Sequence, residues 1–458
     1  MSVSNAAQVH VNAPDSGVWR HLTPHRAVPD AGGFTVVKGR VIHVWDAQGK
    51  RYLDGTSGGV WSVNVGYGRR EIADAVHAQL LELCYFAQTA GSLPAQKLSA
   101  KLLEKMPGMS RVYFSNSGSE ANEKAFKMVR QIAAKKSGGT KHKILYRQRD
   151  YHGTTIACLS ATGQEQRRDQ YGPYVPGFVQ VPHCCEYRSQ WGDVGDYGLR
   201  AADEIERVIL EEGPETVGAL CLEPITAGGG VIPPPEGYWQ RVQEICRRYD
   251  ILLHLDEVVC GLGRTGTWFG YQQYGIQPDI VTMAKGLASG YAAISATVTT
   301  AAVFDAIHDE DGCHKMDYFR DISTFGGCNG GLVAALTNIE IIEREGLLQN
   351  VQAMGDRLLA GLKALQLKHP QVGDVRGKGL FAGIELVSDR SSKTPVCESH
   401  AAAVAAHCMQ NGVLIGRTNR SFVEFNNTLC LSPALIAGED DIDSIVAAID
   451  RALLANPL

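Results

Sequence analysis

A chain of 458 residues and 49.5 kDa is long enough to bury a large core and form two or more domains, which excludes a single small module. Its 44% hydrophobic and 20% charged residues are typical of a soluble globular protein. The net charge of -5, without long runs of Lys or Arg, argues against nucleic-acid or membrane partners and leaves small-molecule ligands open.

The twelve cysteines are scattered through apolar segments without a CxxC pair, which predicts free thiols in a reducing compartment. Cys184 and Cys185 follow His183, but no second ligand pair stands at zinc spacing, so we expect no metal site. Residues 1–16 have neither a basic start nor an apolar core, unlike a signal peptide or a membrane span. We therefore expect a cytoplasmic protein.

The first structured segment predicted is a small antiparallel meander over residues 33–54, where short β-like runs alternate with glycine turns. The loop that follows carries Trp61, which fits either core packing or a pocket wall. Apolar spacing predicts a helix over 71–83, and the aromatic pair Tyr85 and Phe86 comes directly after it.

A serine-glycine turn follows a short predicted strand over 111–114 and opens a predicted helix. Such a turn offers a phosphate free backbone N–H groups, serine hydroxyls and the positive end of the helix dipole. Ser117, Gly118 and Ser119 are therefore candidate phosphate ligands, although the same turn also fits an ordinary helix cap.

The next predicted strand, over 143–147, ends close to Tyr151 and His152. A planar aromatic side chain at such an end can stack on a flat ring. Residues 164–195 contain turn formers without clear periodicity and predict a long irregular excursion. A helical pattern returns near 201–210.

Three further apolar runs predict buried parallel strands over 217–222, 251–255 and 280–283, with a helix over 238–248 between the first two. These strands end at Glu223, Asp256 and Lys285. If the strands are parallel, these groups meet the serine-glycine turn and Tyr151 with His152 at one edge of the sheet, where ligands bind in open α/β folds.

Lys285 is the central residue of this predicted ligand site. A lysine that is partly desolvated there has a lowered pKa and becomes a nucleophile, whereas the alternative is a surface lysine that caps a strand.

Helices are predicted over 331–343 and 347–367, and the rest of the chain alternates strands and helices as a separate α/β lobe.

A phosphate cradle, an aromatic stacker, an acid and an isolated lysine together describe a pyridoxal phosphate site. In that chemistry the lysine holds the cofactor as an imine and a carboxylate keeps the pyridine nitrogen protonated. Asp256 suits the carboxylate role because a buried acid beside a pyridinium stays ionised. Lys285 then exchanges the cofactor with an incoming amine and moves the proton.

The motifs that carry this chemistry resemble those of fold-type I, class III aminotransferases, also called ω-aminotransferases, over nearly the whole chain. They are Ser115-Asn-Ser-Gly-Ser-Glu-Ala-Asn-Glu123, Asp150-Tyr-His-Gly153, Leu255-Asp-Glu-Val-Val259 with Gly263-Arg-Thr-Gly266, and Ala284-Lys-Gly286. The resemblance implies an α/β fold whose large domain has a mostly parallel seven-stranded sheet sandwiched by helices. It also implies a smaller α/β domain built from the N- and C-terminal segments.

The resemblance predicts the domain ranges and the roles of the site residues. Residues 1–60 would form the N-terminal part of the small domain, 61–330 the large cofactor-binding domain and 331–458 the C-terminal small domain. The implied catalytic residues are Lys285, which forms the Schiff base, Asp256 on the pyridine nitrogen, and Tyr151. The implied cofactor contacts are Ser117, Gly118, Ser119, Tyr151, His152, Glu223, Asp256, Lys285 and Val258, which packs on the ring face opposite Tyr151.

The family also implies shared active sites, since a threonine from the partner subunit completes the phosphate site and Thr324 stands at the matching place. The expected assembly is a homodimer, which could pair further into a tetramer. For the substrate carboxylate, Arg417 is the best match to the family's arginine clamp, with Arg420 as its rival because the segment after Arg417 is longer than usual.

Trp61, Tyr85 and Phe86 are expected to wall the amine-side pocket, although simple core packing remains the alternative for them. Segments 57–68 and 419–428 resemble the taurine:pyruvate and β-alanine:pyruvate branch. The leading hypothesis is therefore transfer of an amino group from an ω-amino acid or amine to pyruvate through a ping-pong cycle, giving alanine and an aldehyde or ketone.

Two other classes of function stay open. An aminomutase, racemase or decarboxylase could use the same fold and cofactor. A non-catalytic phosphate-ligand binding protein is disfavoured, because no GxxxxGK[ST] or GxGxxG stretch accompanies the strands.

Overall fold

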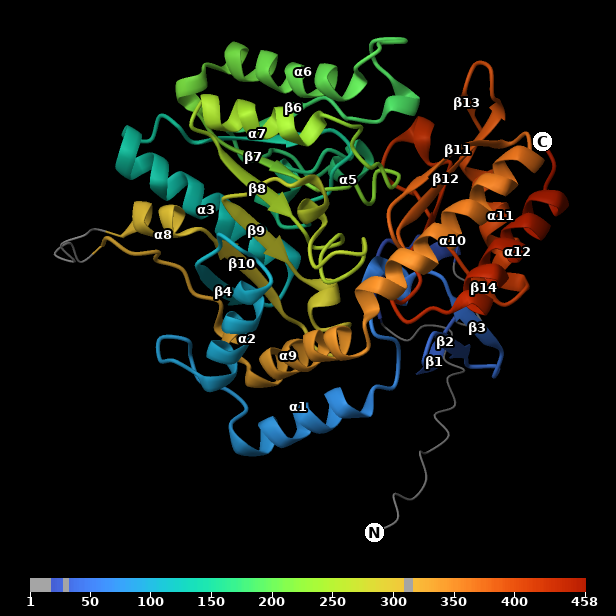
Figure 1. The fold of residues 1–458 in the computed structure, drawn as a ribbon, viewed down its shortest axis with the longest axis horizontal. Coiled ribbons are helices and arrows are strands. Elements are labelled where there is room, and N and C mark those ends of the chain that lie inside the picture. Colours follow the sequence, from blue (N-terminus) through green and yellow to red (C-terminus); the bar gives the residue numbers. More distant parts are fainter. Residues whose placement is uncertain (1–17, 28–32, 309–315) are drawn as a thin grey trace.

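The computed structural model describes residues 18–27, 33–308 and 316–458, so the interpretations of residues 1–16 and Cys313 lie outside the described residues. Within these ranges the chain forms three β-sheets, the largest of which is surrounded by helices (Figure 1). The eleven cysteines described are free thiols. No helix in the described ranges is long and apolar enough to cross a membrane.

The largest sheet has seven strands in the order β4-β10-β9-β8-β7-β5-β6. They are β4 (Arg111–Ser115), β5 (Lys143–Arg147), β6 (Phe178–Val181), β7 (Val217–Leu222), β8 (Leu252–Asp256), β9 (Ile280–Met283) and β10 (Ser295–Thr299). Only β10 runs against its neighbours, and the other six strands share one direction. The predicted mostly parallel seven-stranded sheet is therefore confirmed.

The central strands are buried on both faces because helices cover the sheet. Every residue of β7 and β9 is buried, as expected for continuous apolar runs in a parallel sheet. Helix α3 (Gly118–Ser137) packs along β7, β8, β9 and β10, while α6 (Tyr197–Glu212) and α7 (Tyr238–Arg248) pack on each other and against β6 and β8 (Figure 1).

A second group of helices lies beyond the β4 side of the sheet (Figure 1). Helix α9 (Asn329–Arg344) packs against both α1 (Arg70–Glu82) and α2 (Leu93–Glu104). The sequence predicts α1 and α9 to within two residues. It misses α2, although Ser92 caps that helix through its side chain and Leu98 and Leu102 give it an apolar face.

The smaller lobe is built from segments near both ends of the chain. The predicted meander is confirmed as β1 (Val36–Arg40), β2 (His43–Asp46) and β3 (Arg51–Asp54), and β14 (Val413–Leu414) adds to β3 in parallel. The other small sheet contains β11 (Val372–Gly377), β12 (Ala382–Asp389), β13 (Thr394–Pro395), β15 (Gly416–Arg417) and β16 (Thr428–Leu431).

Three helices accompany these two sheets, namely α10 (Leu347–Lys368), α11 (Glu398–Gln410) and α12 (Glu439–Ala455) (Figure 1). Helix α12 packs on α10 and α11. The N- and C-terminal segments therefore share one α/β lobe, as expected. The boundaries at residues 60 and 330 stay a prediction.

Candidate active site

The carboxyl ends of β5, β7, β8 and β9 and the start of α3 meet at one cavity of about 180 Å³. Its lining combines acids, a lysine, aromatic rings and small residues: Gly118, Ser119, Asn122, Tyr151, His152, Gly153, Glu223, Asp256, Val258, Val259, Ala284 and Lys285. The strand ends converge because the strands are parallel, which places their carboxyl ends at the same edge of the sheet.

Lys285 lies in this cavity rather than on the outer surface of the protein. It lies two residues after the end of β9 and has a φ of 44°, a left-handed conformation that a residue other than glycine adopts at an energetic cost. Its amine nitrogen is 5.3 Å from the centre of the Trp61 ring. Burial lowers the pKa of Lys285, and the charges of Asp256 and Glu223 oppose that change, so the amine is more readily neutral and nucleophilic.

Asp256 supplies a fixed negative charge at the same place. Its side chain is 3% exposed, and Oδ2 lies 2.9 Å from Nδ1 of His152 and accepts from Nδ2 of Asn122 at 2.8 Å. The backbone N–H of Val258 donates to Oδ1 at 3.0 Å. Burial alone would raise the pKa of Asp256, but these hydrogen bonds hold it below its usual value, so the group stays ionised.

Glu223 behaves in the opposite way. Burial, followed by the charges of Asp150 and Asp256, raises the pKa of Glu223 well above its usual value. The backbone N–H groups of Tyr151 and Ala227 donate to its carboxyl oxygens. The pKa shifts of the two acids are therefore opposite, and Asp256 is the one held in its ionised form.

The start of α3 has the features expected of a phosphate cradle. The Ser117 side chain accepts from the backbone N–H of Glu120 at 3.2 Å and so caps the helix. The first N–H groups of a helix have no intrahelical acceptor, which leaves those of Gly118 and Ser119 for a ligand. A side chain at Gly118 would bring its Cβ to 3.0 Å from Cγ2 of Val258, so the absence of a side chain keeps this part of the cavity open.

Several predicted site residues lie elsewhere on the same chain. Thr324 and Phe86 are exposed and do not line the cavity. Tyr85 forms a β-bridge with Cys328, which places the aromatic pair beside the segment that contains Thr324. Arg417 donates to Oε1 of Glu398 at 2.8 Å and is also absent from the cavity lining.

The sequence interpretation missed Asn122, which links two parts of the site. Its amide donates to Asp256 and its carbonyl oxygen accepts from Oγ1 of Thr282 at 2.7 Å. Asn122 stands inside the motif that opens α3, but nothing in its local sequence distinguishes it from a surface asparagine. Its partners lie on β8 and β9, so only the folded sheet reveals its role.

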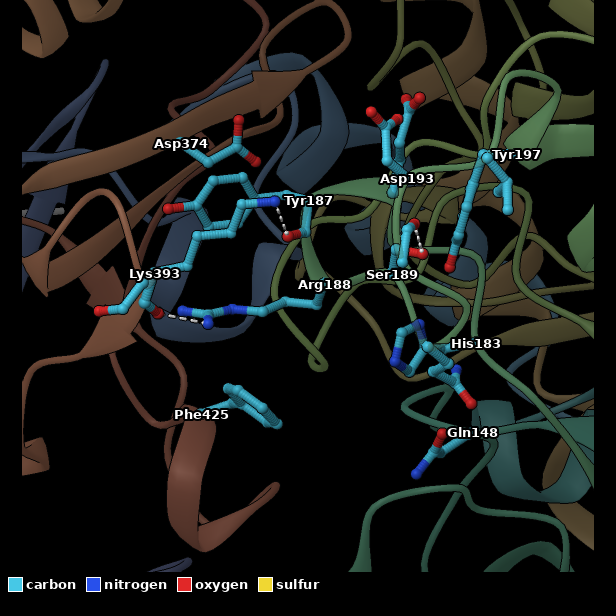
Figure 2. A pocket seen from close by; sticks show the side chains of 15 residues that line it. Gln148, His183, Tyr187, Arg188, Ser189, Asp193, Tyr197, Asp374, Lys393 and Phe425 are labelled. Carbon is cyan, nitrogen blue, oxygen red and sulfur yellow. Dashed lines mark hydrogen bonds between the residues drawn. The ribbon is translucent and has the colours of Figure 1, made fainter.

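A larger cavity of about 1030 Å³ lies between residues 183–197 and the small lobe (Figure 2). Arg188, Lys393 and Phe425 are on its wall, and the carbonyl of Tyr187 accepts from Nζ of Lys393 at 3.1 Å. The catalytic candidates of the smaller cavity, which are Tyr151, His152, Glu223, Asp256 and Lys285, do not line it. The chemistry therefore identifies the smaller cavity as the candidate active site.

A lysine and an ionised aspartate in one cavity, beside a serine-glycine cradle at the carboxyl edge of a parallel sheet, define a pyridoxal phosphate enzyme of fold type I. The chain belongs to the class III aminotransferases, since the family model described as "Aminotransferase class-III" matches residues 27–453. These enzymes depend on pyridoxal phosphate, which supplies an electron sink when it is bound. The cradle and the buried carboxylate fit its phosphate and its ring nitrogen.

Known relatives cover almost the whole chain. It is 65% identical over 447 residues to the hypotaurine/taurine–pyruvate aminotransferase of Paracoccus denitrificans, covering 97% of this chain and 96% of that protein. It is 62% identical over 436 residues to the taurine–pyruvate aminotransferase of Bilophila wadsworthia, covering 95% and 94%.

Solved structures agree with this assignment. A Bacillus anthracis aminotransferase superposes with a TM-score of 0.91 at 41% identity, covering 96% of each chain. The ω-transaminase of Pseudomonas jessenii, solved in complex with PMP, superposes with a TM-score of 0.91 at 35% identity, covering 97% of this chain and 98% of that chain.

Gly153 lies beside the proposed cradle and has a φ of 139°. A Cβ at this position would collide with Oγ of Ser119. We expect Gly153→Ala to displace Ser119 and weaken cofactor binding about tenfold or more, as steric conflicts of roughly 1–3 kcal/mol do. Equilibrium dialysis of the apoprotein against pyridoxal phosphate measures this. Gly139→Ala, at a φ of 88° with open space around it, is the matched control, and equal losses in both variants would contradict the prediction.

Proposed function

We propose that this aminotransferase moves the amino group of taurine, hypotaurine or a related ω-amino acid such as β-alanine to pyruvate, producing alanine and an aldehyde. The observation that carries the transaminase chemistry is the presence of Lys285 and Asp256 in one cavity. The donor and the acceptor are supported by the names of relatives that are 60–65% identical over nearly the full length.

In this proposal each residue of the cavity has a defined task. Lys285 holds the cofactor covalently and moves the proton at the reacting carbon with its amine. Asp256 holds a proton on the ring nitrogen, and His152 and Asn122 position that carboxylate. The remaining cofactor contacts are the phosphate ligands Ser117, Gly118 and Ser119, the ring neighbours Tyr151 and Val258, and the buried acid Glu223.

Alanine formation tests the function directly. The purified holoprotein is incubated with taurine, hypotaurine or β-alanine and pyruvate, and alanine is counted by chromatography. We expect alanine to appear in step with loss of the donor. An aminomutase, racemase or decarboxylase on the same fold would consume the donor without needing pyruvate, and that outcome would contradict the proposal.

Asp256→Asn tests the carboxylate. We expect kcat to fall about ten- to a hundredfold, because a hydrogen bond to a charged group contributes roughly 1.5–3 kcal/mol. The variant should keep its cofactor through the phosphate cradle, which visible absorbance and phosphate analysis would check. Asp305→Asn, on α8 (Ala301–Ile307) outside the cavity, is the control, and an unchanged kcat in Asp256→Asn would remove Asp256 from its role.

We also propose that the protein is a cytoplasmic homodimer whose two subunits share their active sites, and that two such dimers can pair into a tetramer. Thr324 would complete the phosphate site of the partner subunit. The wall of the amine pocket would be formed by Trp61, Tyr85 and Phe86. The support is an exposed apolar surface around these residues, with Phe86 56% and Phe325 66% exposed. Light scattering gives the subunit number, and a monomer with full activity would contradict the shared site.

A further inference from the structure

Three buried polar side chains lie behind Asp256 in the otherwise apolar centre of the large sheet. Asn122 is 1% exposed, and His254 on β8 and Thr282 on β9 are fully buried. Burying a polar group costs free energy unless its hydrogen bonds are made. Thr282 interrupts the apolar run of β9, and His254 interrupts that of β8. Both occupy strand positions that an apolar residue could fill, which indicates that their polar groups have a task.

These side chains form one chain of hydrogen bonds that ends on Asp256. Nε2 of His254 lies 3.1 Å from Oγ1 of Thr282, and Oγ1 of Thr282 donates to Oδ1 of Asn122 at 2.7 Å. Nδ2 of Asn122 donates to Oδ2 of Asp256 at 2.8 Å and to the backbone carbonyl of His152 at 2.7 Å. Thr282 is also the direct neighbour of Asp256 in the pairing of β8 with β9. The chain therefore links α3 to two neighbouring strands of the sheet.

The end groups fix the direction of this chain. Ionised Asp256 and the backbone carbonyl of His152 only accept hydrogen bonds, so Asn122 presents its amide nitrogen to them. Its carbonyl oxygen then faces Thr282, whose hydroxyl donates its single proton to that oxygen and accepts from Nε2 of His254. Burial lowers the pKa of His254 to about 3, so its ring is neutral and carries one N–H. Nδ1 of His254 has no hydrogen-bond partner among the described residues. Every proton of the chain thus points toward Asp256.

Loss of the Thr282 hydroxyl would act on Asp256 at a distance. The carbonyl oxygen of Asn122 would become a buried acceptor without a donor, which is unfavourable. The side chain relieves this by turning, and turning withdraws its N–H from Oδ2 of Asp256. The carboxylate would keep the backbone N–H of Val258 and its contact with Nδ1 of His152 but lose one hydrogen bond. A carboxylate with fewer hydrogen bonds is less stable in its ionised form and a better proton acceptor.

We propose that Thr282 and His254 are positioning residues that hold the carboxylate of Asp256 in the orientation in which a bound cofactor keeps the proton on its ring nitrogen. They act through Asn122, since neither of them lines the cavity. This inference rests on the proposed function, because it concerns the carboxylate that the proposed function assigns to the ring nitrogen.

The test is the NMR chemical shift of the ring nitrogen in the holoprotein, loaded with isotope-labelled pyridoxal phosphate and followed as the pH is raised. This shift reports the fraction of the ring nitrogen that carries a proton. We expect the midpoint of its deprotonation to fall by about half to one pH unit in Thr282→Val, a roughly three- to tenfold change in the proton equilibrium, as expected for one lost hydrogen bond. The titratable residues that line the cavity are unchanged in this variant, and they are Tyr151, His152, Glu223, Asp256 and Lys285.

Three further variants control for a merely structural effect. Thr282→Ser keeps the hydroxyl and should restore the wild-type midpoint. Thr297→Val is the matched control and should leave the midpoint unchanged, because this buried hydroxyl on β10 donates to the backbone carbonyl of Ala121 at 2.8 Å, outside the chain. His254→Phe should lower the midpoint by less than Thr282→Val, since Thr282 still has its proton for Asn122. Retained cofactor absorbance shows that each variant is folded.

A double variant tests whether the hydroxyl acts through the amide. Thr282→Val should have no further effect when it is added to Asn122→Ala, because residues that act on one group in series are not additive. An additive fall in the double variant, an equal midpoint in Thr282→Val and the wild type, or an equal fall in Thr282→Ser or in Thr297→Val would each overturn the proposal.

Asp256→Asn separates this inference from the proposed function. We expect this variant to lose more of the ring-nitrogen proton than Thr282→Val, because it removes the carboxylate itself. A ring nitrogen that titrates in Asp256→Asn as in the wild type would sink the role of Asp256 in the proposed function. A midpoint that falls in Asp256→Asn but not in Thr282→Val would sink the positioning chain alone.

Discussion

Replacing Lys285 by alanine is expected to lower kcat with every amine donor by roughly 10³-fold or more, since loss of a positioned general acid–base alone costs about 10²–10⁴-fold. Its amine sits in the cavity with Asp256 and Glu223, and burial lowers its pKa toward a nucleophilic neutral form. Among the residues that the structure describes, no other lysine lines this cavity. Steady-state alanine formation with taurine and pyruvate measures the loss.

The variant should still bind pyridoxal phosphate reversibly, because the cradle at the start of α3 is independent of the lysine. Dialysis should therefore remove the cofactor from Lys285→Ala and leave it on the wild type. Lys97→Ala, at an exposed position of α2, is the control and should behave like the wild type. Turnover at the wild-type rate in Lys285→Ala would overturn the assignment of the active site.

The largest loss of stability is expected from Glu385→Gln. This side chain is 1% exposed, and its two oxygens accept from Nε of Arg188 at 2.6 Å and Nη1 of Arg376 at 2.7 Å. Arg188 belongs to the 164–195 excursion and lines the cavity of Figure 2, whereas Arg376 lies on β11. Removing the negative charge leaves Arg188 without an acid and Arg376 with Asp374 alone, and breaking such a buried ion pair costs about 3–5 kcal/mol.

The expected result is a clear drop in the thermal unfolding midpoint of the holoprotein at pH 7, measured by calorimetry. Glu340→Gln, at an exposed position on α9, is the matched control and should change the midpoint little. An equal midpoint in Glu385→Gln and the wild type would show that the small lobe and the excursion are held together by other contacts.

The same glutamate makes stability depend on pH. Burial raises the pKa of Glu385, but Arg376, Arg188 and Arg149 outweigh that effect and lower it to about 2. A carboxyl whose pKa is lower in the folded state stabilises the fold above its unfolded pKa, and this contribution is lost as pH falls toward the folded value. The midpoint difference between wild type and Glu385→Gln should therefore be full at pH 6 and shrink between about pH 4.5 and pH 2. A constant difference across that range would contradict this cause.

Local sequence predicted the elements that carry the reaction. The strands at 143–147, 217–222 and 280–283 and the helix at 238–248 have the predicted bounds, because apolar runs bounded by turn residues need no distant information to be recognised. Their polar ends at Tyr151, Glu223 and Lys285 line one cavity. The parallel order of the strands requires this convergence.

Elements that depend on distant partners were not predictable in the same way. Strand β6 has only four residues and is defined by its parallel pairing with β5, so the sequence showed an irregular excursion there. Asn122 is recognisable as a site residue only through its hydrogen bonds to Asp256 and Thr282.

By itself, then, the amino-acid sequence determined the family, the cofactor and the lysine and aspartate of the site, since short motifs at strand ends carry that information. The tertiary structure decided how Arg417 is paired and which distant segments meet beside it. Strand β15 turns Arg417 toward Glu398, while hydrogen bonds between residues more than 250 positions apart in the chain join Gln164 and Gln166 to Ser421 and Asn426. The direction of a side chain depends on the pairing of its strand and on the segment packed against it, and neither is encoded in the residues around it.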